Sequence, residues 1–122
     1  MNLTYTIDKT ANIVNVVYTG HPEFVEWAEM MYNVFRDPDF KAGFSFLLDR
    51  RGVKTPPSTG YIERVVAFSR QHRKELGKSK IATVVGEPGS YGMARMFQGL
   101  TPENRSLRVF TDIDEARRWL TG

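Results

Sequence analysis

The stretch RSLRVFTDIDEARRWL, residues 105–120, decides the fold class of this chain. Leu107, Val109 and Phe110 stand among polar neighbours in the alternating pattern of a short strand. The next residues, Thr-Asp-Ile-Asp at 111–114, form a capping box of the Ser/Thr-x-x-acid type and predict a helix with its N-cap at Thr111. A strand that runs directly into a capped helix is the repeating unit of an α/β fold.

The same alternation of strands and helices extends upstream through the chain. The predicted elements are strands at 3–7 and 13–18 that form an antiparallel hairpin, a helix at 22–36, a strand at 44–48, a helix at 61–76, a strand at 80–86 and a short helix around 93–100, followed by the strand and helix of 105–120. The order ββαβαβαβα predicts a mixed sheet of about five strands, with the hairpin strand at an edge and helices on both faces. The order of the strands within the sheet cannot be derived from these patterns.

Composition indicates one globular domain, residues 1–122, of which 41% are hydrophobic and 25% charged. The absence of cysteine excludes disulfides, a thiolate nucleophile and cysteine-ligated zinc, and fits a reducing compartment. No apolar run reaches the roughly 20 residues that span a bilayer, and the first residues do not have the pattern of a secretory signal. We therefore expect a cytoplasmic protein.

Three segments together resemble a known family. The opening hairpin, the strand KIATVVG at 80–86 and the ending VFTDIDEARRWL at 109–120 are similar to SpoIIAA-like proteins, which belong with the STAS domains and share a fold type with CRAL-TRIO lipid-transfer proteins. The resemblance implies an interaction module without enzymatic activity of its own. In some relatives this module is switched by phosphorylation of a serine in an Asp-Ser-Ser-Gly sequence between a strand and a helix.

The matching position in this chain reads Pro57-Ser58-Thr59-Gly60, with proline in place of the acidic residue. The resemblance makes Ser58 and Thr59 candidates for a phosphosite or a partner-binding loop, where a phosphate would add about two negative charges. The alternative is that Ser58 or Thr59 only caps the following helix.

Charged residues follow the strand at 44–48. Ligands of open α/β sheets bind beyond the carboxyl ends of parallel strands, and Asp49, Arg50 and Arg51 occupy such an end. Their guanidinium groups, next to a helix N-terminus, would suit a phosphate, a carboxylate or a charged partner. The alternative is a solvated loop in which the arginines pair with Asp49.

The helix at 22–36 carries more apolar surface than one sheet face normally hides. Trp27, Met30 and Met31 belong to this stripe. Either a second element packs on it, or a dimer partner or an apolar ligand does. Met93, Met96 and Phe97 in the short helix could complete such a ligand pocket or dimer surface, because methionine adapts to varied partners.

Other chemistries have little support. Two histidines without cysteine make a poor metal site, and no Gly-x-Ser-x-Gly nucleophile elbow, phosphate-binding glycine motif or nucleic-acid motif is present. We expect no catalytic residue, metal, cofactor or nucleic-acid partner. The favoured function is a small non-enzymatic interaction or regulatory module that binds a protein partner through the strand-end loops near Ser58. The alternative is a carrier or sensor of a small apolar or lipid-like ligand, and a homodimer is a further hypothesis.

Overall fold

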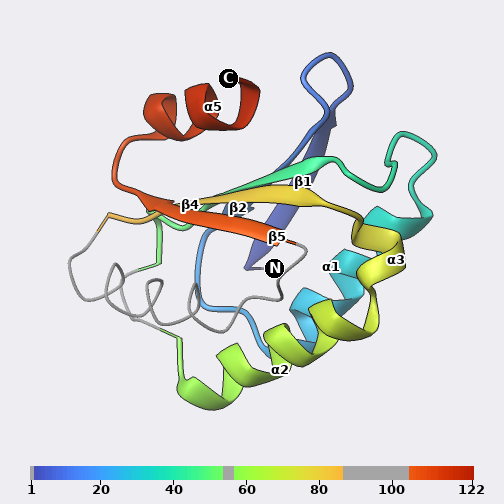
Figure 1. Ribbon diagram of the computed structural model, residues 1–122. Coiled ribbons are helices and arrows are strands. Elements are labelled where there is room, and N and C mark those ends of the chain that lie inside the picture. The colour runs from blue at the N-terminus through green and yellow to red at the C-terminus, as the bar shows by residue number, and fades with distance from the viewer. Residues whose placement is uncertain (1, 54–56, 87–104) are drawn as a thin grey trace.

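The structure is a computed structural model, which describes residues 2–53, 57–86 and 105–122. The described elements in chain order are β1 (Leu3–Asp8), β2 (Ile13–Tyr18), α1 (Phe24–Arg36), β3 (Ser45–Asp49), α2 (Thr59–Gln71), α3 (Arg73–Leu76), β4 (Ser79–Val84), β5 (Arg105–Phe110) and α5 (Ile113–Thr121) (Figure 1). The short helix expected around Met93, Met96 and Phe97 lies outside the described residues.

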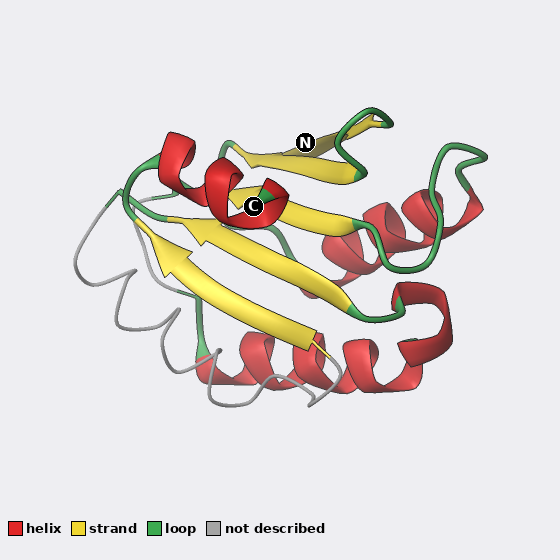
Figure 2. Cartoon of the chain, turned by 45° about the horizontal axis from the view of Figure 1, so that its top comes forward, coloured by secondary structure: helices red, strands yellow, loops and turns green. Residues whose placement is uncertain are grey.

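The strands form one mixed sheet in the order β1-β2-β3-β4-β5 (Figure 2). β1 pairs antiparallel with β2, while β2, β3, β4 and β5 run parallel to one another. The hairpin strand β1 is at an edge, as the sequence predicted. Strand order in the sheet equals strand order in the sequence, which the sequence patterns did not reveal.

Helices cover both faces of the sheet, because alternate residues of each strand point to opposite sides. On β3, Phe46 packs into the cluster on the side of α1 and α2, whereas its neighbour Leu47 packs into the cluster under α5. Figure 1 shows α5 on one side of the sheet and α1, α2 and α3 on the other. The predicted α/β architecture is therefore confirmed.

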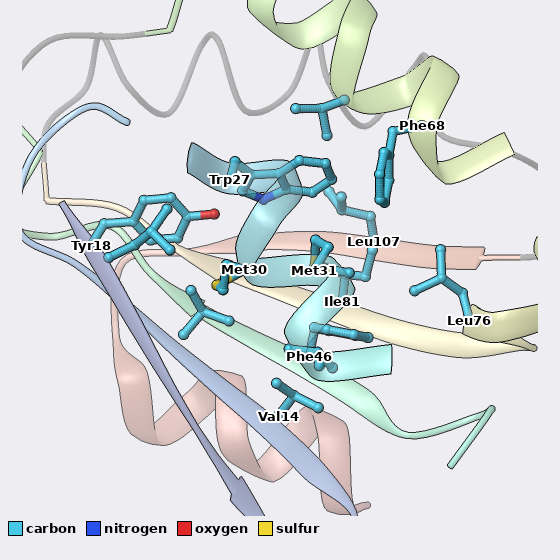
Figure 3. Close-up of a cluster of buried hydrophobic side chains, with 14 of the residues drawn as sticks. Val14, Tyr18, Trp27, Met30, Met31, Phe46, Phe68, Leu76, Ile81 and Leu107 are labelled. Atoms are coloured by element: carbon cyan, nitrogen blue, oxygen red, sulfur yellow. The ribbon is translucent and has the colours of Figure 1, made fainter. Parts of the chain in front are cut away.

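The wide apolar stripe of α1 is covered by the sheet and by α2. Trp27, Met30 and Met31 are between 4% and 7% exposed and belong to the main core (Figure 3). The ring of Phe68 on α2 contacts Trp27 edge-on, with centroids 5.1 Å apart, and stacks on Phe35 at 6.2 Å. The sequence left open whether a second element, a dimer partner or an apolar ligand covers this stripe. In the structure, α2 is a second element that packs on it. These three residues face the core, and their role as a ligand or dimer surface stays a prediction.

The helix expected at 61–76 is two helices, α2 and α3, separated at His72. This residue has φ −112° and ψ 33°, outside the helical region, although its N–H still donates to the Phe68 carbonyl. Its imidazole Nδ1 contacts the Glu75 carboxylate, and its ring packs 4.2 Å from that of Phe68. Gly77 ends α3 with a positive φ of 67°. Side-chain contacts at His72 therefore accompany a break that helical periodicity did not predict.

The start of α5 also differs from the expectation. Asp112, and not Thr111, is the N-cap, and its carboxylate accepts hydrogen bonds from the N–H groups of Asp114 and Glu115. Ala116 and Leu120 then pack against the sheet. The helix begins one residue later because Asp112 supplies the capping oxygen.

Candidate functional site

The candidate site lies at the edge of the sheet where the parallel strands β2 and β3 end. Tyr18 is the last residue of β2, and Arg50 directly follows β3. The N-terminus of α2 lies beside them, since Tyr61 in its first turn is in electrostatic contact with both Tyr18 and Arg50. Loops and a helix N-terminus thus converge at the carboxyl ends of the strands, as expected for an open α/β sheet.

Ser58 is the N-cap of α2. Its hydroxyl oxygen accepts a hydrogen bond of 3.1 Å from the Tyr61 N–H, and its φ and ψ of −72° and 157° are those of an N-cap. The helix starts at Thr59, two residues before the expected position. The capping role considered for Ser58 is therefore found. Both Ser58 and Thr59 are exposed to solvent, and their role as phosphosite or partner loop stays a prediction.

A pocket of about 550 Å³ lies against the start of α2. Its walls are His21, Pro22, Glu23 and Phe24 from the end of the β2–α1 connection and the first residue of α1, together with Ser58, Gly60, Tyr61 and Arg64. The His21 ring meets that of Tyr61 edge-on at 4.9 Å. The Arg64 guanidinium lies over the Phe24 ring, 5.8 Å from its centroid.

Gly60 is the smallest residue of this pocket. A Cβ atom built on it meets no atom within 4 Å, and its φ does not require glycine. Sequence reasoning identified Ser58 but missed Gly60, His21 and Arg64 as neighbours in one pocket. Only His21 carried a usable signal, since it follows the end of a predicted parallel strand.

Asp49, Arg50 and Arg51 do not act as one group. Arg51 forms a two-pronged ion pair with Asp49, from Nε to Oδ1 at 2.9 Å and from Nη2 to Oδ2 at 2.8 Å. The Arg51 guanidinium holds the pKa of Asp49 below its usual range. The sequence left open that the arginines of this loop are solvated and pair with Asp49. The structure shows this arrangement for Arg51.

Arg50 points to the opposite side of the sheet from Asp49, toward α1 and α2. Its guanidinium lies over the ring of Tyr18, 4.6 Å from the ring centroid. Tyr18 is buried, and Figure 3 shows its hydroxyl directed toward Trp27. Burial raises the pKa of the Tyr18 and Tyr61 hydroxyls, and the charge of Arg50 opposes part of each rise. Within the described residues, Arg50 Nη2 and the Tyr61 hydroxyl are buried and have no hydrogen-bond partner.

Comparison with known proteins agrees with this architecture. No protein-family model and no curated protein matches the chain. Among solved structures it is similar to an uncharacterized protein of the DUF3478 family from Shewanella loihica PV-4, which is described as having a SpoIIAA-like fold. The TM-score is 0.67 at 14% sequence identity, over 98% of this chain and 94% of the other. The chain has a SpoIIAA-like fold.

The sequence Pro57-Ser58-Thr59-Gly60 spans the end of the connection from β3 and the first two residues of α2, which begins at Thr59. The described residues contain no group of three or more His, Cys, Asp or Glu side chains that could hold a metal ion. None of the described helices has the length and apolar character needed to cross a membrane. The chemistry available at the site is hydrogen bonding, ring contact and positive charge.

Proposed function

We propose that this chain is a non-enzymatic STAS-type interaction module that binds a protein partner through the Ser58 surface. We define the Ser58 surface as His21, Ser58, Gly60, Tyr61 and Arg64, the residues around the pocket at the start of α2. The SpoIIAA-like fold supports a module of this type. The observation that carries the proposal is the pocket itself, which lies at the strand ends and has Gly60 in its wall.

Gly60 supports the proposal because a glycine inside a helix lowers stability relative to alanine by roughly 0.5–1 kcal/mol. Nothing in its surroundings requires a glycine, since its Cβ position is empty and its φ is not in the left-handed region. A glycine there leaves the backbone of the first turn of α2 accessible to an approaching partner. The pocket beside it offers space for a side chain of that partner.

The other residues of the Ser58 surface have the character of an interface. Tyr and Arg are enriched at protein–protein interfaces, where aromatic and guanidinium groups combine apolar area with hydrogen bonding. Tyr61 is half-buried and Arg64 is exposed. Both can contact a partner without unfolding any described element.

The alternative function, a carrier or sensor of an apolar or lipid-like ligand, has less support. Trp27, Met30 and Met31 are packed between the sheet and α2. Met93, Met96 and Phe97 lie outside the described residues. We therefore favour the partner-binding function.

The test compares two tryptophan substitutions on one helix. Gly60→Trp fills the pocket, whereas Ala67→Trp places the same side chain two turns further along α2, at an exposed position outside the pocket. A partner is first captured from cells that express the chain, then purified and titrated calorimetrically against each variant. We expect Gly60→Trp to weaken binding at least tenfold and Ala67→Trp to change it less than twofold. Equal affinities for both variants, or no partner at all, would contradict the proposal.

Regulation at Ser58 is tested with two variants that both preserve the helix cap. Asp and Asn are N-caps as good as Ser, so Ser58→Asp and Ser58→Asn should fold as the wild type does. Only Ser58→Asp adds negative charge in the place of a phosphate. We expect Ser58→Asp alone to change partner affinity. The regulatory part of the proposal fails if the Asp and Asn variants bind alike.

A further inference from the structure

Arg50 carries a charge that forms no ion pair with a carboxylate of the described residues. Side chains along β3 alternate between the two faces of the sheet, so Phe46 and Leu48 point toward α1 and α2. The same two-residue period points Arg50 to that face, while Asp49 points to the other. The Asp49 carboxylate is already paired with Arg51. Among the described residues, therefore, the guanidinium of Arg50 has aromatic neighbours but no carboxylate in ion-pair contact.

Two buried polar atoms at this place are also unsatisfied. Arg50 Nη2 and the Tyr61 hydroxyl have no hydrogen-bond partner within the described part of the chain. A buried donor without a partner lowers the stability of the fold, and more so when it is charged, so each such group in a folded protein needs an explanation. Tyr18 and Tyr61 do not balance the charge as phenolates, because burial keeps both hydroxyls protonated.

We propose that Arg50 and Tyr61 bind an oxyanion group, a carboxylate or a phosphate, of a small ligand. Guanidinium N–H groups and a phenol O–H are all donors, and a carboxylate or phosphate offers several acceptor oxygens in the matching geometry. The oxyanion would supply both the missing negative charge and the missing hydrogen-bond acceptors. Among the described residues, the carboxylate that acts on the Tyr61 hydroxyl is that of Glu26, and it already accepts hydrogen bonds from Asn2.

The pocket gives this ligand a route. Tyr61 is the shared residue, since its ring forms part of the pocket wall while its hydroxyl lies next to Arg50. Arg64 and His21 in the other walls favour an anion, whereas Glu23 opposes one. Arg50 itself is half-buried and does not line the pocket, so a ligand would reach it past Tyr61. The site shares Tyr61 and this pocket with the Ser58 surface, but anion binding needs no protein partner, so its test can fail while the proposed function stands.

The test measures thermal unfolding of the purified chain in Tris–chloride with added sodium chloride, sodium phosphate or sodium acetate at equal ionic strength. We expect the Tm to rise with phosphate, acetate or both, following the logarithm of one plus the ratio of the anion concentration to the Kd, with a rise of about 5 °C at ten times the Kd. A response to phosphate alone indicates a phosphorylated ligand, and a response to acetate alone indicates a carboxylate. No rise above the chloride control for either anion overturns the proposal.

Three variants assign the response to the two residues. Arg50→Gln should weaken anion binding at least tenfold and Tyr61→Phe severalfold, while the matched control Arg51→Gln should stay within twofold of the wild type. Equal losses in Arg50→Gln and Arg51→Gln would overturn the assignment. If Arg50→Gln does not fold, two other measurements show whether the anion binds at this site. They are the anion affinity of Tyr61→Phe and an NMR titration of the Arg50 Nε–H signal in the wild type. That signal must shift with the anion for the proposal to stand.

Discussion

Gly60 and Gly77 allow one substitution, glycine to alanine, to be tested at two positions with opposite expected signs. At Gly60 the added Cβ meets no atom within 4 Å and φ is ordinary. Alanine restricts the unfolded chain and is a better helix former, so Gly60→Ala should stabilise the fold by about 0.5–1 kcal/mol. The free energy of unfolding of a 122-residue chain changes by about 0.26 kcal/mol per degree near Tm. The Tm should therefore rise by about 2–4 °C.

At Gly77 the same substitution meets a backbone that favours glycine and a crowded neighbourhood. Its φ is 67° and its ψ is −162°, a conformation that costs a residue with a side chain about 1–3 kcal/mol. The added Cβ would also lie 2.7 Å from the backbone nitrogen of Gly43 and 3.2 Å from Ala42. Gly77→Ala should therefore destabilise the fold by more than about 2 kcal/mol and lower the Tm by about 8 °C or more.

Differential scanning calorimetry of the wild type and both variants provides the measurement, with urea unfolding at 25 °C as the second readout. A lower Tm for Gly60→Ala would mean that its side of α2 is not open, and the argument that uses this glycine as a mark of an interface would be lost. An unchanged Tm for Gly77→Ala would mean that the chain does not turn at α3 as described.

The remaining predictions concern a helix cap, the core and an ion pair. Asp112→Ala should destabilise the fold by about 1 kcal/mol in urea unfolding, whereas Thr111→Ala should change it by less than about 0.5 kcal/mol; the reverse order would place the N-cap at Thr111 after all. Phe68→Ala should destabilise the fold by about 3–5 kcal/mol, because the ring is 5% exposed and packs against several rings of α1; a loss under 1 kcal/mol would show that α2 does not complete the core. Arg51 lowers the pKa of Asp49 in the folded state from its reference value of 3.8, so the pair stabilises the fold above about pH 4 and this contribution is lost as the pH falls below that value. Urea unfolding between pH 2 and 7 should therefore show a weaker acid dependence in Asp49→Asn than in the wild type, and parallel curves would contradict the pair.

The strands were predictable because the two-residue alternation of apolar side chains is a local signal. The strands expected at 44–48 and 80–86 lie at Ser45–Asp49 and Ser79–Val84. The order of parallel strands is not local, since nothing in an apolar run states which strand lies beside it. Consecutive strands pair throughout this sheet, and only the three-dimensional packing reveals this.

Errors at the helix ends have identifiable causes. Thr111 and Asp112 can each act as an N-cap, since Thr111 has an acid three residues on in Asp114 and Asp112 has one in Glu115. The sequence contains two overlapping capping boxes, and tertiary structure selects the second. At His72 the break accompanies contacts with Glu75 and Phe68, which the apolar periodicity of a helix does not encode.

The sequence predicted which strand end carries the charged residues of the candidate site, but not the directions of their side chains. The strand-end rule selected Asp49, Arg50 and Arg51, which stand at the end of β3 in the structure, but treated them as one charged group. The alternation of β3, extended by two residues, separates Arg50 from Asp49 and would have corrected this interpretation. The pocket at Gly60 had no such signal, because its walls come from two segments more than thirty residues apart.

Among the described elements, α5 is the last along the chain and the only helix on its side of the sheet. Ile13, Leu47, Ala82 and Val84 pack in the cluster that includes α5. On the ribosome, α5 cannot cover this apolar surface until it has been synthesised and has emerged from the exit tunnel. A stop codon ahead of α5 would thus release a chain in which these apolar side chains lack the helix that packs on them, a form that chaperones and proteases would recognise.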